Sequence, residues 1–255
     1  MLIDVITDVL SKNDLVTAFA FIGLLVFVSY RFSYLLTRGR IHGSAIAITL
    51  GLVLAYFGGK YTGGSKGLAD IPIFAGIGIM GGAMLRDFAI VSTAFGADLS
   101  SLKKAGYVGA LSIVIGVILS FTIGGIVAVL FGYSDSISIA TIGAGAATYI
   151  VGPVTGTALG ATTEVMALSV AAGLVKSVLV MVGTPLVAKT VGLNNPTSAM
   201  IYGGLMGTTS GVAGGLAATD PKLVPYGAMT ATFYTGVGCL MAPSLLFMIV
   251  SLIFG

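Results

Sequence analysis

The chain alternates long apolar runs with short polar connections, a pattern that predicts a protein crossing a membrane several times. Roughly 20 apolar residues in a helix cross the hydrocarbon layer, so the chain has room for about eight membrane segments. Because hydrocarbon offers the backbone no hydrogen-bond partner, we expect helical segments and an all-α polytopic membrane protein. The more regular apolar runs cover residues 15–36, 41–58, 71–85, 105–131, 165–187 and 223–254.

Two further runs, residues 136–161 and 198–218, are apolar but rich in glycine, threonine and serine. In the first run Pro153 removes a backbone donor, and several glycines lower the helix propensity around it. A loosened backbone at membrane depth is tolerated only inside protein or beside a wet cavity. We therefore expect each run to be a broken helix or a re-entrant hairpin that offers polar groups to a ligand, as in secondary transporters.

The C-terminal half has the pattern of two copies of one unit. Each copy is a loosened run that ends in an acid and is followed by a span containing a proline: ALGATTE precedes Pro185, and GLAATD precedes Pro243. We accordingly divide one transmembrane transporter domain, residues 1–255, into N-terminal scaffold spans, 1–131, and a repeated transport unit, 136–255. If both loosened runs are re-entrant, the first enters from outside and the second from inside, which predicts an inverted repeat.

Composition and charge placement agree with this prediction and add an orientation. A mean hydropathy of +1.08 and only 8% charged residues exclude a soluble protein, in which about a quarter of residues are charged. Acidic residues dominate before the first span, whereas Arg31, Arg38 and Arg40 follow it, and Lys103 with Lys104 precedes the fourth. The positive-inside rule then places the N-terminus outside and Arg38 and Lys103 in the cytoplasm.

The sequence carries no assembled catalytic machinery. It lacks an H-E-x-x-H pair and a P-loop, and its G-x-S-x-G match, GGSKG at residues 63–67, lies in a polar connection between apolar runs rather than on a strand-to-helix turn, so we expect no enzyme and no ATP-driven pump. With Cys239 as the single cysteine and His42 as the single histidine, neither a disulfide nor a transition-metal site is expected. Energy for transport must then come from a gradient.

Lys176 is the most costly polar residue in the apolar runs. It lies about twelve residues, or roughly 18 Å along a helix, into the run 165–187, which puts it near mid-membrane. A lysine at that depth costs about 2.5 to 3.5 kcal/mol, so it must face protein, water or an anion. Either it is paired only for structure, or it neutralises an anionic substrate or an acid.

Hydroxyls and acids beside the loosened runs complete the candidate site. A ligand that leaves water needs replacement oxygens or donors, although hydroxyls also bond back to their own helices. Carboxylates suit hard cations, but Glu164 and Asp220 can equally serve as a helix-start charge and a turn residue. We assign substrate binding to Lys176, Thr155, Thr157, Thr208, Thr209 and Ser210, and ion coupling to Glu164, Asp220, Thr162 and Thr163.

The stretch GAGAATYIVGPVTGTALGATTEVMALSVAAGLVKSVLVMVGTPLVAK, the length of 255 residues and the N-terminal pattern together resemble the MadM family. This family is the larger membrane subunit of the sodium-coupled malonate transporter. The resemblance implies symport of malonate, a small dicarboxylate, with Na+ as the coupling ion. It also implies a smaller membrane subunit, MadL, as partner, and leaves open a homo-oligomer of the heteromeric unit.

Two other classes remain open from the residues. A channel or export-type membrane protein of the murein-hydrolase-regulator kind would use similar glycine-rich helices without a coupled ion. If this chain were a purely structural subunit, its partner would carry the transport site. The two loosened polar runs in this chain argue against that class. Sodium dependence of solute accumulation distinguishes the symporter from the channel.

Overall fold

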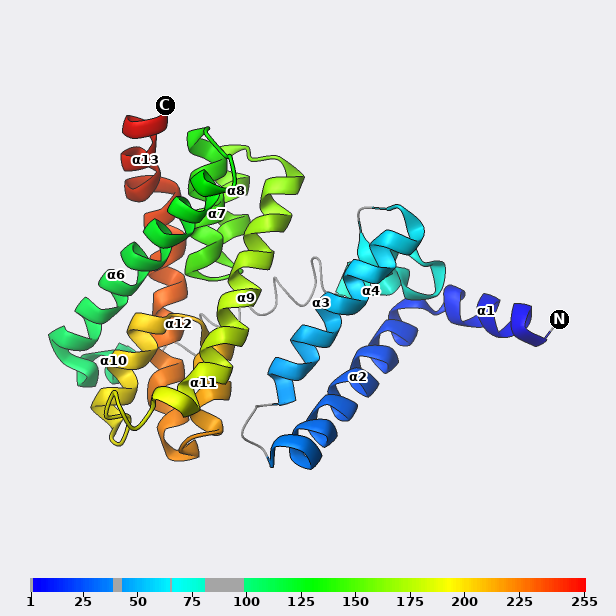
Figure 1. Ribbon diagram of the computed structural model, residues 1–255, viewed down its shortest axis with the longest axis horizontal. Coiled ribbons are helices and arrows are strands. Elements are labelled where there is room, and N and C mark those ends of the chain that lie inside the picture. Colours follow the sequence, from blue (N-terminus) through cyan, green and yellow to red (C-terminus); the bar gives the residue numbers. More distant parts are fainter. Residues whose placement is uncertain (1, 39–42, 65, 81–98) are drawn as a thin grey trace. The chain divides into compact units, whose positions relative to one another are not determined.

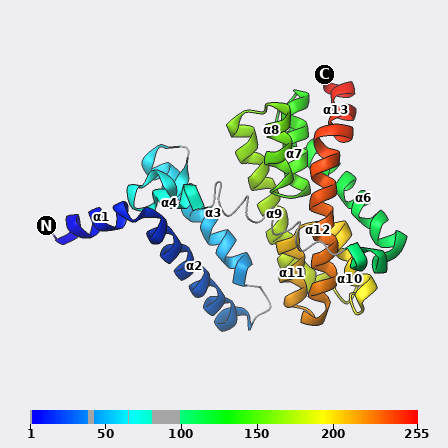
Figure 2. The same ribbon diagram turned by 180° about the vertical axis from the view of Figure 1, so that it is seen from behind.

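The computed structural model describes residues 2–38, 43–64, 66–80 and 99–255, and within these ranges it contains helices and no strand. Five segments are long and apolar enough to cross a membrane, and shorter apolar helices accompany them. The protein is thus an all-α polytopic membrane protein, as predicted. The chain forms two compact units, Met1–Ser92 and Thr93–Gly255, which are described separately (Figures 1 and 2).

The N-terminal unit is built on two long helices. α1 is Leu2–Lys12, α2 is Asp14–Thr37 and α3 is Gly43–Thr62; η1 (Gly67–Asp70), η2 (Pro72–Phe74) and α4 (Ala75–Ile79) follow. α2 and α3 approach closely where Gly43 lies against Tyr30, since a side chain at position 43 would collide with that ring. The basic residues Arg40 and His42 and the end of the predicted run 71–85 lie outside the described residues, as does the side chain of Lys103.

The C-terminal unit combines three long helices with two pairs of short ones. α6 (Leu99–Leu130) is interrupted at Gly106, and α9 (Thr163–Val187) and α12 (Val224–Met241) are the other long helices. The last span continues from α12 through the π-helical η5 (Ala242–Leu246), which contains Pro243, into α13 (Phe247–Phe254). The short elements are α7 (Ser136–Ala147), α8 (Val151–Leu159), α10 (Pro196–Met206), α11 (Thr209–Ala217) and η4 (Pro221–Leu223).

α7 and α8 form a re-entrant hairpin, which we call the first hairpin. Gly145 lies opposite Gly152, and Thr141 lies opposite Gly156, so the two arms are antiparallel. α7 runs parallel to α9, with Gly145 against the Ser169 carbonyl. Because α8 returns along α7, the hairpin enters and leaves on the side where α9 begins.

The ends of the first hairpin follow from its sequence. The Asp135 carboxylate accepts a hydrogen bond from Ser138 N at 2.8 Å and caps α7. Partial burial alone would raise the pKa of Asp135, but hydrogen bonds from Ser138 and neighbouring amides outweigh it, so the pKa lies below its usual value. Pro153 stands at the centre of the glycine-rich run, but the helix is not broken there. It lies in the first turn of α8, where a missing N–H costs no helical hydrogen bond, and the helix is interrupted earlier, at residues 148–150.

α10 and α11 form the second hairpin, which enters from the opposite side. α11 runs parallel to α9, because Gly211 lies against Ser177 and Gly215 against Thr184. α10 begins after the far end of α9, so both arms of the hairpin open toward that end. The turn between the arms is made by Gly207, whose φ of 71° is the left-handed conformation that glycine adopts without strain.

The two hairpins with their following spans repeat in detail with inverted direction. Gly145 packs on the Ser169 carbonyl, and Gly203 packs in the same way on the Gly227 carbonyl, both 58 positions further along the chain. These contacts and the opposite directions of the hairpins agree with an inverted repeat, and the assignment of residues 136–255 as a repeated transport unit stays a prediction. α6 belongs to the same compact unit as the hairpins, and a scaffold role for residues 1–131 stays a prediction.

Candidate functional site

The interruptions of both hairpins meet at one turn of α9. We call residues 148–150 the first break and residues 207–208 the second break. Gly173 lies directly on the backbone of Tyr149 in the first break, and any side chain at this position would collide with it. One turn later the Ser177 hydroxyl shares a 2.5 Å hydrogen bond with the Thr208 hydroxyl of the second break. The middle of α9 thus contacts both interruptions.

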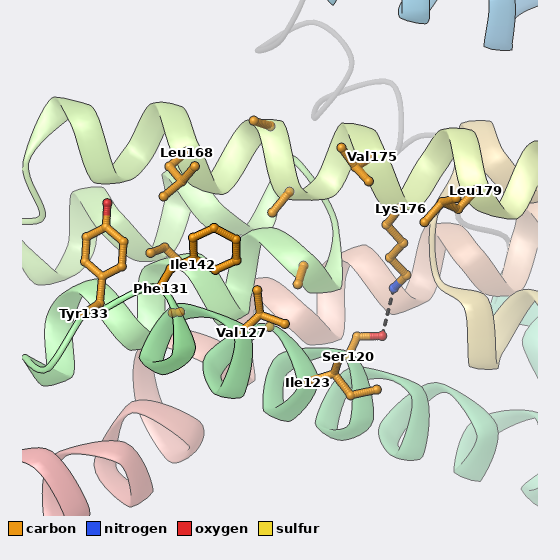
Figure 3. Close-up of a pocket in the computed structure, with 15 residues that line it drawn as sticks. Ser120, Ile123, Val127, Phe131, Tyr133, Ile142, Leu168, Val175, Lys176 and Leu179 are labelled. Carbon is orange, nitrogen blue, oxygen red and sulfur yellow. Dashed lines mark hydrogen bonds between the residues drawn. The ribbon is translucent and has the colours of Figure 1, made fainter.

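Lys176 lies between these two contacts, and its ammonium bonds only neutral groups. Nζ donates to Ser120 Oγ at 2.8 Å (Figure 3). It also donates to the Ala147 carbonyl at the end of α7 at 2.8 Å and to the Tyr234 hydroxyl at 3.3 Å. It also lies 5.0 Å from the centre of the Tyr234 ring. The ion pair found among the described side chains is elsewhere, between Lys12 and Asp8. The mid-membrane charge is therefore solvated by dipoles rather than paired with a described acid.

Tyr234 is a site residue that sequence reasoning missed. It is fully buried, donates from its hydroxyl to the Gly116 carbonyl at 3.1 Å, and lays its ring against Gly207 of the second break. It also stands 58 positions after Lys176, so the repeat places both residues at the same level of equivalent helices. Aligning the two copies by this spacing is the signal that could have found Tyr234.

A cavity of about 630 Å³ lies between α6, α7 and α9, with Lys176 and Ser120 at one end and Tyr133 at the other (Figure 3). Apart from these three residues its lining is apolar, and Ile123, Val127 and Val175 are among the side chains that form it. The ammonium of Lys176 is directed toward Ser120 at the end of the cavity (Figure 3). Its aliphatic stem contributes to the apolar lining of the cavity, and its ammonium lies at the end of the cavity, next to the first break.

The structure separates the predicted hydroxyls. Thr208 caps α11 by accepting from Gly211 N at 3.4 Å, Thr209 begins that helix, and Ser210, whose hydroxyl is buried, lies beside Tyr149. These three hydroxyl residues adjoin the second break. By contrast, Thr155 is fully buried within the first hairpin. Thr157 is exposed on α8, where its hydroxyl lies 3.8 Å from Met166 Sδ.

Comparison with known families gives a match over nearly the whole chain. Residues 6–254 match the family described as malonate/sodium symporter MadM subunit. The chain belongs to this family. Sodium is accordingly the coupling ion, and the protein is a transporter subunit, as the resemblance implied. Searches of curated proteins and of solved structures gave no match.

In this MadM-family chain the two predicted ion-coupling acids lie at helix starts, away from Lys176. The Thr162 hydroxyl caps α9 by accepting from Val165 N at 3.3 Å, and Thr163 and Glu164 form its exposed first turn. Asp220 accepts from Lys222 N at 3.0 Å at the start of η4. Asp220 thus acts as a capping residue, Glu164 lies in the first turn of α9, and the part of both acids in ion coupling stays a prediction.

Acidic side chains do not assemble a cation site within the described part of this MadM-family chain, where no group of three His, Cys, Asp or Glu residues occurs. Sodium is a hard cation that also accepts hydroxyl and carbonyl oxygens as ligands. The interrupted helices of both hairpins, and the hydroxyls beside them, offer such oxygens at mid-membrane.

Proposed function

We propose that this chain carries malonate together with Na+ across the bacterial inner membrane, as the larger subunit of a two-component carrier with the smaller subunit MadL. Membership of the MadM family supports the coupling and the substrate class. The observation that carries the proposal is the Lys176 ammonium, held between both helix breaks by neutral partners alone.

The substrate site in this proposal is built around the two breaks. Malonate is a short dianion, and one carboxylate would take hydrogen bonds from Lys176 in place of those to Ser120 and the Ala147 carbonyl. α8 and α11 begin at the breaks, so the positive ends of their dipoles favour an anion there. Thr208, Thr209 and Ser210 supply hydroxyls beside the second of these helix starts. Thr155 and Thr157 lie away from this position and contribute less to it.

Alternating access follows from the inverted arrangement of the hairpins. With the N-terminus outside, the first hairpin opens toward the periplasm and the second toward the cytoplasm. Movement of either hairpin away from α9 would break the contacts of Lys176 or Ser177 with that hairpin and expose the breaks to one side. Glu164, with Thr162 and Thr163, and Asp220 stand at the rims of the first and second hairpin, where cations would enter in this proposal.

The test replaces Lys176 by methionine, which keeps the apolar stem and removes the charge. We expect Lys176→Met to raise the apparent KM for malonate at least about tenfold, because roughly 1.4 kcal/mol of binding free energy corresponds to a factor of ten. Lys189→Met is the matched control, since Lys189 is an exposed residue just after the same helix. A folded Lys176→Met protein with unchanged malonate affinity would make Lys176 structural.

The assay is uptake of radiolabelled malonate into proteoliposomes, with and without a sodium gradient and with and without MadL. A symporter accumulates malonate above its equilibrium concentration only when the sodium gradient is present. Equilibration that ignores sodium would instead support the channel or export-type alternative. Full accumulation by this chain without MadL would refute the two-component assignment.

A further inference from the structure

Two hydroxyls in the first hairpin have no hydrogen-bond partner although their residues are fully buried. They belong to Thr141 of α7 and Thr155 of α8. Buried threonines in helices usually bond back to the carbonyl four residues earlier, as Thr184 and Thr235 do in this chain. An unpartnered buried hydroxyl loses its bonds to water without compensation, so it indicates a ligand.

The two threonines lie on the facing arms α7 and α8, about one helical turn from the level at which both arms contact α9. Gly145 and Gly152 both pack against Ser169 of α9, which is itself fully buried. Thr141 and Thr155 are four and three residues from these glycines, about one helical turn or 5.4 Å along their helices. The Ser169 hydroxyl donates to the Met166 carbonyl at 2.6 Å, which leaves its oxygen able to accept or to ligate.

The second hairpin shows that the fold does not require these hydroxyls. At the spacing of 58 positions, the equivalents of Thr141, Thr155 and Ser169 are small residues without a hydroxyl: Ala199, Ala213 and Gly227. Ala199 is as fully buried as Thr141. The second copy thus builds the same hairpin with residues that carry no hydroxyl at these three positions. The oxygens in the first copy therefore serve a purpose other than forming the hairpin.

We propose that a sodium ion binds inside the first hairpin, with the hydroxyl oxygens of Thr141, Thr155 and Ser169 among its ligands. Helix carbonyls complete the coordination, since each has a second lone pair beyond its helical hydrogen bond. The proposal rests on sodium coupling and deepens the proposed function by naming an ion site that uses no carboxylate. Neutral oxygens suit a monovalent cation at this depth, because an unpaired carboxylate there would be costly to bury.

This location connects the ion to the substrate site. The bound ion joins the two arms of the first hairpin to α9, and α7 ends at Ala147, whose carbonyl holds Lys176. Sodium binding therefore orders the first break beside the ammonium before malonate arrives. Malonate affinity should rise with sodium concentration, and sodium affinity should rise by the same factor when malonate is bound.

The experiment measures sodium binding without malonate. Thermal unfolding of the purified full chain is followed while NaCl replaces KCl at constant ionic strength, because an ion that binds only the folded state raises Tm by mass action. We expect Thr155→Val, which keeps the shape of the side chain and removes the hydroxyl, to raise the sodium midpoint at least tenfold. The sodium midpoint is the concentration at which half of the folded protein binds the ion, and it is fitted from the rise of Tm with sodium. Thr155→Ser, which keeps the hydroxyl, should stay within about threefold of the wild type. Thr235→Val is the control, since the Thr235 hydroxyl is buried and bonded to its own helix.

Three outcomes would overturn the proposal: a wild-type Tm that does not respond to sodium, a Thr155→Val protein with the wild-type sodium midpoint, or a Thr155→Ser protein as impaired as Thr155→Val. Thr141→Ala provides a second, independent reading at the facing arm, and Ala199 shows that alanine is tolerated at this level. Failure of the proposed malonate site is distinguishable, because Lys176→Met would then keep the wild-type malonate affinity, whereas failure of the sodium site appears in the sodium midpoints of the Thr155 variants.

Discussion

The close approach of α9 to the first break predicts that Gly173 tolerates no side chain. A Cβ at this position would lie 2.5 Å from Tyr149 Cα and 2.7 Å from the Gly145 carbonyl oxygen, where ordinary contact needs at least 3.4 Å. The obstacles are backbone atoms, which cannot rotate away as a flexible side chain could. Gly173→Ala must therefore push the first hairpin away from α9.

The free-energy cost combines two opposing effects. Overpacking in a tight interior costs about 1–3 kcal/mol, whereas replacing glycine by alanine inside a helix gains roughly 0.5–1 kcal/mol. The matched control is Gly183→Ala in the same helix, because a Cβ there would meet nothing within 4 Å. It should show the gain alone. Because both variants share this gain, they should differ by the overpacking cost alone, about 1–3 kcal/mol, or roughly 2–12 °C in Tm for a chain of this size.

Thermal unfolding of both variants in the same detergent tests the magnitude, and malonate uptake tests the consequence. Gly173→Ala should also lose transport, because displacing the first break removes the Ala147 carbonyl from Lys176. Equal Tm values for Gly173→Ala and Gly183→Ala would refute the packing of the first break on α9. Normal transport in a destabilised Gly173→Ala protein would refute the link from this packing to the site.

Three further predictions concern Tyr234, the two acids and the orientation. Tyr234→Phe keeps the ring and removes one acceptor of the Lys176 ammonium, so the KM for malonate should rise about 3- to 10-fold, in keeping with a weak bond to a charged group; an unchanged KM in uptake assays would make this hydroxyl structural. If Glu164 and Asp220 couple ions, Glu164→Gln and Asp220→Asn should shift the sodium activation curve of uptake. If both variants keep the wild-type curve, Glu164 and Asp220 serve only as a helix-start charge and a turn residue. A cysteine replacing Arg38 should react with an impermeant thiol reagent only from the cytoplasmic side, and labelling from the periplasm would reverse the topology.

The membrane segments and the two hairpins could be predicted, because hydrophobic runs, glycine-rich runs and their repetition are visible in the sequence itself. Lys176 stood out since a charge at mid-membrane has a cost that demands a partner. The exact break could not be predicted, because Pro153 is compatible with the first turn of a helix as well as with its end. Tyr234 was missed since a neutral aromatic residue in an apolar span looks like core until its contacts are known.

The hydroxyls show a different limit of sequence reasoning. Thr141, Thr155 and Thr235 are the same residue type with similar apolar neighbours. The sequence therefore does not distinguish a hydroxyl bonded to its own helix from one without a partner. The difference depends on rotamer and on the distance between packed helices. Once the repeat is known, the comparison of Thr155 with Ala213 recovers part of this information, because it asks what the same backbone position needs.

The centre of the repeat explains why a symmetric backbone carries asymmetric chemistry. The spacing of 58 positions brings the equivalents Lys176 and Tyr234 into contact, with Nζ 3.3 Å from the tyrosine hydroxyl. Had both copies kept a lysine, two ammonium groups would meet at mid-membrane, and like charges about 4 Å apart repel by roughly 4 kcal/mol even at an effective dielectric constant of 20. A lysine opposite a tyrosine avoids this repulsion, since the phenol oxygen accepts one hydrogen bond from the ammonium while its O–H donates to the Gly116 carbonyl. In the proposed transport mechanism, one lysine gives the two copies a single shared anion site, whereas two symmetric lysines would have required an anion at all times to offset their repulsion.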